Sequence, residues 1–323
     1  MEKFFLPFLY SFAASILAIP LLLRIGKKYK NIKRISGGVV ILIFVLGVLF
    51  NKNLVITPQI LGIIIGGLLI LVFGFWDDLK NLSWKWQLLF QIIIAIVAIS
   101  FGVRSLYLTN PSGGIINLQN PFLYYSLFSI FYLLFINSLN WLDGVDGLSG
   151  SVTLVALFTI FFLSFKPEVN QPAVAILTAI SAGAILGLLV FNWAPAKILA
   201  GTAGAWFFGF LLASFSIFAG AKVATVLMVA LIPILDFFYV IWERWQAGEP
   251  IVKEDDRHLH YRLIKLGLSK TEITLMVSAA TALVGIIALN ASAMGKIFFA
   301  ILLAAIYFAI ARILSLKCRN FEN

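Results

Sequence analysis

The sequence predicts an all-α fold, a polytopic membrane bundle of about eleven transmembrane helices. The first observation is composition: the 323 residues are 62% hydrophobic and only 12% charged, whereas a soluble domain is about half apolar and roughly a quarter charged. The second is a mean hydropathy of +1.03. The third is that apolar runs recur along the whole chain between short polar breaks. We find no internal repeat or soluble segment among them, so residues 1–323 are predicted to form a single membrane domain.

Each expected span is an apolar run that polar residues end on both sides. The first run has no small-x-small cleavage motif and is long enough to cross, so we expect a helix there rather than a signal peptide. The second run is short, which predicts a tilted helix or a locally thinned bilayer. The expected spans are 4–23, 37–51, 58–75, 86–102, 121–138, 149–165, 172–190, 204–219, 222–242, 272–290 and 296–315.

Lysine and arginine predict the orientation of the bundle, because the cytoplasmic loops of membrane proteins are enriched in them. If the loop after the first span is inside, 18 of the 24 basic residues fall inside and 6 fall outside. The N-terminus is then outside and the C-terminus is cytoplasmic. This bias accounts for most of the +10 net charge, so nucleic acid is not expected as a partner.

In this orientation the dense polar loops all lie on the cytoplasmic side of the membrane, and we expect that side to be the active face. The outer loops are short or carry only turn residues. The cytoplasmic loops are 24–36, 76–87, 139–148, 191–203 and 243–271.

Two acidic pairs stand where apolar runs end on this face. Asp77 and Asp78 are adjacent, whereas Asp143 and Asp146 are three residues apart and would share one face of a helix. Carboxylates near lipid are costly to maintain, and their oxygens suit a hard cation. The glycine after each member of the second pair would let backbone N–H groups approach a phosphate. The pattern predicts a metal-assisted reaction on a phosphate; the alternatives are a helix cap and a glycine-rich turn.

Both histidines of the chain, His258 and His260, lie in one loop beside Arg257 and Arg262. Arginine binds phosphate through two parallel hydrogen bonds. A neutral histidine can bind metal or donate a hydrogen bond to phosphate. The cluster therefore predicts a phosphate or metal site, and the alternative is a pair of solvated histidines at the membrane interface.

Two further features have two interpretations each. Gly37 and Gly38 open a helix after a basic loop, which suits either a phosphate at the helix N-terminus or close packing of helices. Asp236 lies inside an expected span, where a carboxylate must contact a protein partner or line a cavity.

Together these motifs resemble the polyprenyl-phosphate N-acetylhexosamine-1-phosphate transferases of the glycosyltransferase family 4 type. The resemblance extends from about Arg34 to Lys270 in the expected order, and the ordered set is more specific than any single motif. The His-x-His-Tyr form is typical of the GlcNAc-1-phosphate transferase branch rather than of the phospho-MurNAc-pentapeptide translocases. The motifs are Ser36-Gly-Gly38, Asp77-Asp78 followed by Gln91, Asn137-x-x-Asn140-x-x-Asp143-Gly-x-Asp146-Gly-Leu148, Phe191-Asn192-x-x-Pro195-Ala196-Lys197, Pro233-Ile-Leu-Asp236 and His258-x-His260.

The resemblance implies transfer of a sugar 1-phosphate, GlcNAc-1-phosphate, from a UDP-amino sugar to an undecaprenyl-type polyprenyl phosphate in the cell membrane. UMP would leave, and the lipid-diphospho-sugar would start a cell-envelope glycan such as lipopolysaccharide or teichoic acid. The resemblance also implies Mg²⁺, with Mn²⁺ as the alternative, to clamp the diphosphate and offset developing charge. The sequence leaves open whether the chain forms a homodimer.

The resemblance implies roles for individual residues as well. Asp77 and Asp78 are expected to be catalytic, with Asp77 as the base or positioning group for the lipid phosphate. Asp78, Asp143 and Asp146 are expected to hold the metal. The expected substrate-binding residues are Asn140, Asp143, Asp146, Asn192, His258, His260, Arg262 and Lys85.

Four positions depart from the family pattern. Thr202 stands where the family has a metal-binding aspartate, and threonine keeps an oxygen but no charge. Asn81 replaces a third aspartate, Tyr261 a histidine, and Gln87 a lysine whose space Lys85 could fill. Thr202 supports the alternative of a catalytically silent relative that binds polyprenyl lipid or a partner. An ion-coupled transporter is disfavoured because the polar groups gather on one face rather than at the midplane.

Overall fold

The structure is a computed structural model that describes residues 2–25, 33–110, 113–218, 223–252 and 255–322. Parts of two expected loops, at 26–32 and 253–254, lie outside the described residues.

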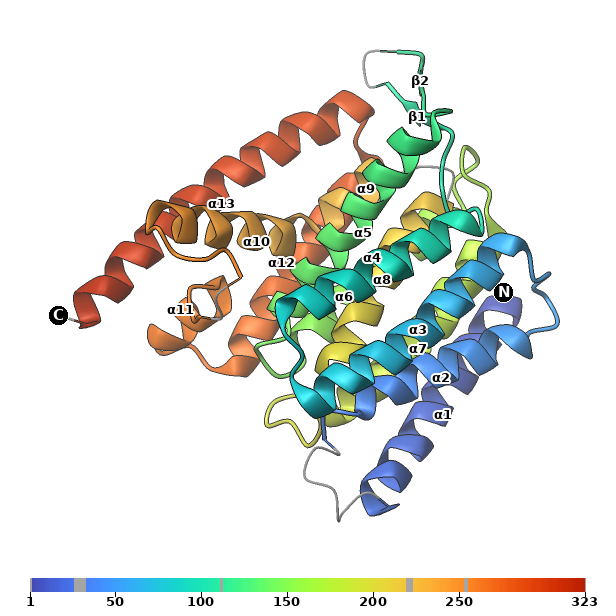
Figure 1. Cartoon of the computed structure of the whole chain (residues 1–323), viewed down its shortest axis with the longest axis horizontal. Helices are drawn as coiled ribbons and strands as arrows, with labels where there is room; N and C mark the ends of the chain where they lie inside the picture. The colour runs from blue at the N-terminus through green and yellow to red at the C-terminus, as the bar shows by residue number, and fades with distance from the viewer. Residues whose placement is uncertain (1, 26–32, 111–112, 219–222, 253–254, 323) are drawn as a thin grey trace.

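The described chain is almost entirely helical, with one small hairpin between α4 and α5 (Figure 1). Strands β1 (Tyr107–Thr109) and β2 (Ile115–Asn117) pair antiparallel, with Tyr107 opposite Asn117. The helices are α1 (Glu2–Ile25), α2 (Ser36–Leu49), α3 (Pro58–Lys80), α4 (Trp84–Ser100), α5 (Pro121–Leu142), α6 (Leu148–Ser164), α7 (Pro172–Asn192), α8 (Gly201–Phe218), α9 (Val223–Val229), α10 (Leu231–Gln246), α11 (Leu259–Lys265), α12 (Lys270–Asn290) and α13 (Ala293–Glu322).

Every described helix except the short α11 falls on one of the eleven expected spans, which confirms a polytopic helical membrane fold. Among the described residues, seven helices are long and apolar enough to cross a membrane. The shorter apolar helices α2, α4 and α6 correspond to three more expected spans. The last, 222–242, is a pair of helices, α9 and α10, bent by 70° at their junction.

The bend between α9 and α10 lies next to Pro233, in the first turn of α10. Proline has no N–H to donate and its ring clashes with the carbonyl four residues earlier, so it suits a first turn and disrupts a helix interior. Ile234 N bonds to Ala230 O at 3.1 Å, which starts the new helix. The expected span 222–242 is thus a broken one, made of two helices.

Helices α7 and α8 form the centre of the bundle. Over a membrane-length window, 83% of the residues of each are buried by neighbouring helices. By contrast α1 and α13, at opposite edges of the molecule (Figure 1), are buried over only 17% and 11% of that window. Their exposed apolar side chains, such as Phe298 and Ile301 on α13, fit contact with lipid tails.

Glycines bring α2 and α3 close to the start of α8. A Cβ at Gly37 would lie 2.2 Å from Ala200 O, and a Cβ at Gly74 would lie 2.5 Å from Ala203 Cα. Small residues at helix crossings allow backbones to approach in this way. Of the two interpretations of Gly37, the structure supports close packing. The same packing sets the end of α3, which carries the first acidic pair, against the N-terminus of α8.

Candidate active site

A cavity of about 890 Å³ lies where these helix ends meet. All five expected cytoplasmic loops contribute lining residues to it. One part of its wall is apolar, with Trp84 and Leu88 from α4 and Phe237 and Ile241 from α10. The polar and charged lining side chains are Arg34, Asp77, Asp78, Asn81, Ser83, Gln87, Gln91, Asn137, Asn140, Asp143, Thr202, Arg244, Asp255, His258 and Tyr261.

Asp77 is buried and accepts three hydrogen bonds from neutral donors. Leu82 N and Gln87 Nε2 donate to Oδ1 at 2.9 and 3.0 Å. Thr202 Oγ1 donates to Oδ2 at 2.7 Å. Asn81, which ends α3 with a left-handed φ of 49°, turns the chain so that the next N–H points back at Asp77. The Asp77 carboxylate is therefore held in one orientation at the wall of the cavity.

Asp78 caps the N-terminus of α8 from another helix. Its Oδ1 accepts from Thr202 N at 2.8 Å and its Oδ2 from Ala203 N at 3.3 Å. The first N–H groups of a helix have no partner within the helix, and they favour a negative charge. Gly201, the residue before these two donors, has a left-handed φ of +67°, and a Cβ there would lie 2.2 Å from Arg34 O, so only glycine fits.

Asp143 and Asp146 lie in the turn between α5 and α6. The segment is therefore not helical, which was the condition for the two carboxylates to share one helix face. The turn forms because α5 ends at Leu142 and Gly147 has a left-handed φ of 75°. Asp143 lines the cavity and accepts a short hydrogen bond from Ser149 Oγ. Burial raises the pKa of Asp143 to about 7, and the negative charges of Asp78 and Asp146 act in the same direction.

Asp146 and Asn192 fasten loops together and do not line the cavity. Asp146 Oδ2 accepts from Lys270 Nζ at 3.1 Å and from Ala196 N at 3.2 Å. Asn192 is buried; its Oδ1 accepts from Gly147 N at 3.2 Å and its Nδ2 donates to Ile198 O at 2.8 Å. Asp146 and Asn192 therefore hold the loops around the cavity in place and do not face a substrate in it.

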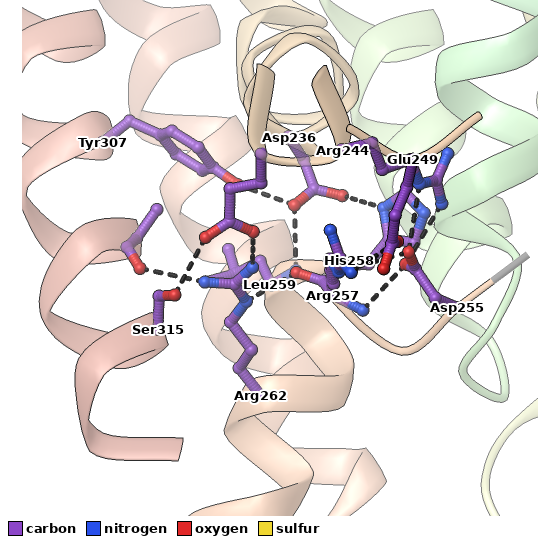
Figure 2. Close-up of polar contacts among 12 residues, drawn as sticks. Asp236, Arg244, Glu249, Asp255, Arg257, His258, Leu259, Arg262, Tyr307 and Ser315 are labelled. Carbon is purple, nitrogen blue, oxygen red and sulfur yellow. Dashed lines mark hydrogen bonds and ion pairs between the residues drawn. The ribbon is translucent and has the colours of Figure 1, made fainter. Parts of the chain in front are cut away.

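His258 reaches the cavity with its ring bonded to the buried carboxylate of Asp236 (Figure 2). The His258 Nδ1–Asp236 Oδ2 distance is 2.7 Å. Asp236 Oδ1 accepts from Leu259 N at 2.8 Å and from Tyr307 OH at 2.7 Å. Of the two interpretations of Asp236, the structure supports a carboxylate with protein partners.

The other predicted site residues of this region lie away from the cavity lining. His260 is 1% exposed and stacks on His258 with ring centroids 5.6 Å apart. Within the described part of the chain neither of its ring nitrogens has a hydrogen-bond partner, and burial lowers its pKa to about 4, so it is neutral near pH 7. Arg262 is buried against Glu243 and Ala311 O. Lys85 is exposed on the surface beside Trp84.

Arg244 is a cavity residue that the sequence reasoning missed. It is 2% exposed, forms two hydrogen bonds of 3.1 Å to the Asp255 carboxylate, and lies over the Trp141 ring at 4.9 Å. An arginine at the end of an apolar run, eleven residues before an aspartate, was the available signal. Gln91 and Asn137 form a second polar pair, with Asn137 Nδ2 donating to Gln91 Oε1 at 2.8 Å.

The expected metal ligands are not assembled into a cluster. Among the described residues, no three His, Cys, Asp or Glu side chains converge as a ready metal site. Of the expected ligands, Asp78 and Asp143 line the cavity, and together with Asn140 each can offer an oxygen atom. Mg²⁺ prefers oxygen and is commonly held by one or two carboxylates together with substrate phosphates. The residues therefore fit a Mg²⁺ site that a phosphate-bearing substrate would complete.

Comparison with known proteins identifies the family. The family described as Glycosyl transferase family 4 matches residues 60–220. A phospho-N-acetylmuramoyl-pentapeptide-transferase of Lactobacillus gasseri is 32% identical over 86% of this chain and 96% of its own length. The chain belongs to glycosyl transferase family 4. The matched segment includes Asp77, Asp78, Asp143 and Thr202, whereas the histidines lie beyond it.

Two further relatives of this chain have names that mention N-acetylglucosamine. A probable undecaprenyl-phosphate N-acetylglucosaminyl 1-phosphate transferase of Bacillus subtilis is 24% identical over 86% of this chain and 82% of its own. A decaprenyl-phosphate N-acetylglucosaminephosphotransferase of Mycobacterium tuberculosis is 31% identical over 39% of this chain and 34% of its own.

Proposed function

We propose that this protein transfers GlcNAc-1-phosphate from UDP-GlcNAc to a polyprenyl phosphate and releases UMP. The observation that carries the proposal is the composition of the cavity wall. Asp77, Asp78 and Asp143 face the same space as the apolar side chains of α4 and α10. A site that joins a water-soluble nucleotide sugar to a lipid phosphate needs both kinds of wall. The names of the Bacillus and Mycobacterium relatives support the same reaction.

In this reaction a phosphate oxygen of the lipid attacks the β-phosphorus of the UDP-sugar. The bond from that phosphorus to the bridging oxygen breaks, and the electron pair leaves with UMP. The product is a lipid-diphospho-sugar, which would begin a cell-envelope glycan. Asp77 is held by three donors, which favours a positioning role toward the lipid phosphate. His258 lines the same cavity, where it can contact a phosphate group.

Mg²⁺, or Mn²⁺ in its place, is the cofactor that the proposal includes. When bound, it would neutralise charge on the diphosphate. Asp78 and Asp143 are the residues that would hold it. Asp143 in particular is a carboxyl whose pKa is raised by burial and by two neighbouring aspartates, and a cation would offset each of these effects.

The proposal places the cavity on the cytoplasmic side of the cell membrane, with the N-terminus outside and the C-terminus inside. The distribution of lysine and arginine supports this orientation. A homodimer is compatible with the exposed apolar faces of α1 and α13, but the catalytic proposal does not require one.

The first test is UMP release by purified protein given polyprenyl phosphate, Mg²⁺ and a panel of UDP-amino sugars that includes UDP-MurNAc-pentapeptide. We expect release with UDP-GlcNAc that depends on both lipid and metal. Asp77→Asn should abolish it while the protein stays folded, and near wild-type turnover would contradict the role given to Asp77. If folded protein binds lipid and releases no UMP with any sugar, the chain is the catalytically silent relative.

A further inference from the structure

Helix α13 lies at the edge of the bundle, yet one of its faces holds the segment that carries the histidines. Positions 307, 311 and 315 are four residues apart, so they lie on one side of the helix. Each bonds to α10 or to the histidine segment, residues 258–262; Figure 2 shows Tyr307 and Ser315 pointing toward this region. The bonds are Tyr307 OH to Asp236 Oδ1 at 2.7 Å, Arg262 Nη1 to Ala311 O at 3.1 Å, and Ser315 Oγ to Glu243 Oε1 at 2.8 Å.

The two oxygens of the Asp236 carboxylate have different hydrogen-bond partners. Oδ1 accepts from Leu259 N and from Tyr307 OH, and Oδ2 accepts only from the His258 ring. Because a carboxylate can only accept, the hydrogen between it and His258 sits on Nδ1. Nε2, on the far side of the ring, is then the nitrogen that remains for a substrate.

The neighbouring carboxylates are bonded to other groups. Asp236 is therefore the acid that sets the state of the His258 ring, while Trp141 and His260 confine the ring sterically, with centroids at 5.3 and 5.6 Å. The other bonded pairs are Glu243 with Arg262 and Ser315, and Asp255 with Arg244 and Arg257.

We propose that Asp236 and Tyr307 are positioning residues that keep the Nδ1–H of His258 directed at Asp236, so that the neutral ring is the Nδ1–H tautomer and Nε2 faces the cavity. There Nε2 accepts a proton or a hydrogen bond from a phosphate OH, and once protonated it donates to an ionised phosphate oxygen. Tyr307 anchors Oδ1, so that Oδ2 stays directed at the ring. The phosphate is that of the proposed function, whereas the tautomer is a property of the protein alone. The C-terminal helix, although mostly exposed, thereby acts on the site through Asp236.

Asp236→Asn provides a sharp test. The amide has one oxygen, and the two donors at Oδ1 would hold it there. The amide NH₂ would then face His258 and donate to Nδ1, which forces the hydrogen onto Nε2. Asp236→Asn should therefore reverse the tautomer without changing the shape of the side chain.

The tautomer is measured by NMR on the full-length protein labelled with ¹⁵N-histidine. The chain has only two histidines, so His260→Gln assigns both signals. At alkaline pH we expect Nδ1–H for His258 in the wild type and Nε2–H in Asp236→Asn. The proposal would be overturned if His258 were the Nε2–H tautomer in the wild type, or if the His258 signals were the same in Asp236→Asn as in the wild type.

Kinetics test Tyr307. Tyr307→Phe should lower kcat about tenfold with little change in KM, since a misplaced catalytic contact affects the rate more than binding. In a His258→Gln background it should have no further effect, because it acts through that ring. The matched control is Tyr132→Phe, which also removes one buried tyrosine hydrogen bond, but one that joins α5 to α8, to Ser214 at 3.0 Å, rather than one to Asp236.

The two readouts separate this proposal from the proposed function. If Asp236→Asn reverses the tautomer but neither the wild type nor any variant releases UMP, the positioning role stands and the proposed transferase activity is wrong. Equal losses of kcat in Tyr307→Phe with and without His258 would make Tyr307 a structural residue only.

Discussion

Thr202 is bonded to both members of the first acidic pair. Its hydroxyl donates to Asp77 at 2.7 Å and its backbone N–H donates to Asp78 at 2.8 Å. Gln87 donates to the other oxygen of Asp77. Asp77 therefore accepts hydrogen bonds from two neutral side chains. The family resemblance led us to expect an aspartate at position 202 and a lysine at position 87. Threonine at position 202 therefore has two consequences. It removes an expected metal-binding carboxylate, and it adds a hydroxyl that positions Asp77.

We expect Thr202→Asp to lower the rate of UMP release by about tenfold or more, because a second carboxylate would face Asp77 and like charges in contact are unfavourable. Thr202→Ser keeps the hydroxyl and should retain most activity. Adding Gln87→Lys to Thr202→Asp should restore part of the loss, which a double-mutant cycle measures. A rate above wild type for Thr202→Asp would instead identify a weakened metal site.

The raised pKa of Asp143 predicts a pH-dependent cost to stability. The pKa is about 7 in the fold and about 3.9 in an unfolded chain. Between these values the folded state holds more protons than the unfolded state, so the stability from this group falls as pH rises from about 4 to 7.

Asp143→Asn should therefore raise Tm at pH 8 by about 2–4 °C in metal-free buffer, although it should abolish UMP release. The gain should shrink at pH 5, where Asp143 is mostly protonated in the fold. Thermal unfolding at both pH values measures it. A variant no more stable than wild type at pH 8 would show that the buried charge costs nothing.

At the scale of elements, hydropathy predicted where the helices run, because a bilayer requires long apolar segments whatever their partners. It could not predict the break beside Pro233, since proline is also common in continuous transmembrane helices. Nor could spacing predict the roles of Asp146 and Asn192. Their partners, Lys270 and Gly147 among them, are brought close by helix packing between segments far apart in the sequence.

The turn after α5 packs directly on the histidine segment at Gly144. A Cβ there would lie 2.5 Å from His260 Nε2 and 2.5 Å from Tyr261 OH. The ring of His260 is buried and cannot move away freely. The contact couples the acidic turn to the position of His258, which stacks on His260.

We expect Gly144→Ala to separate the turn from the histidine segment and to lower UMP release by about 10- to 100-fold, because small displacements of reacting groups have large effects on rate. The control is Gly295→Ala on α13, where the nearest atom is the hydroxyl of Ser292 at 3.2 Å. Equal activity of the two variants would mean that the segments can separate without consequence.

At the scale of the whole molecule, a central pair of helices supports a site built at one end of the bundle. The buried helix α8 supplies its N-terminus to Asp78 and Thr202 to Asp77, whereas the peripheral helix α13 contacts α10 and the histidine segment behind the cavity and bonds to Asp236 through Tyr307. The exposed faces of α1 and α13 are mostly apolar, with Arg312 and Lys317 as exposed charges in the last part of α13, whereas the charged cavity residues come from the loops and helix ends on one side of the bundle. The function depends on which side of the membrane those loops face.

The proposed orientation predicts different labelling of two exposed acidic positions. Glu168, between α6 and α7, should face outside, whereas Asp256, before the histidine segment, should face the cytoplasm. Each is replaced by cysteine in a Cys318→Ser background, which removes the chain's single native thiol. A membrane-impermeant thiol reagent should label Glu168→Cys in intact cells and Asp256→Cys only after permeabilisation. The reverse pattern would put the cavity outside, away from cytoplasmic nucleotide sugars, and would contradict the proposed reaction even if the purified protein released UMP.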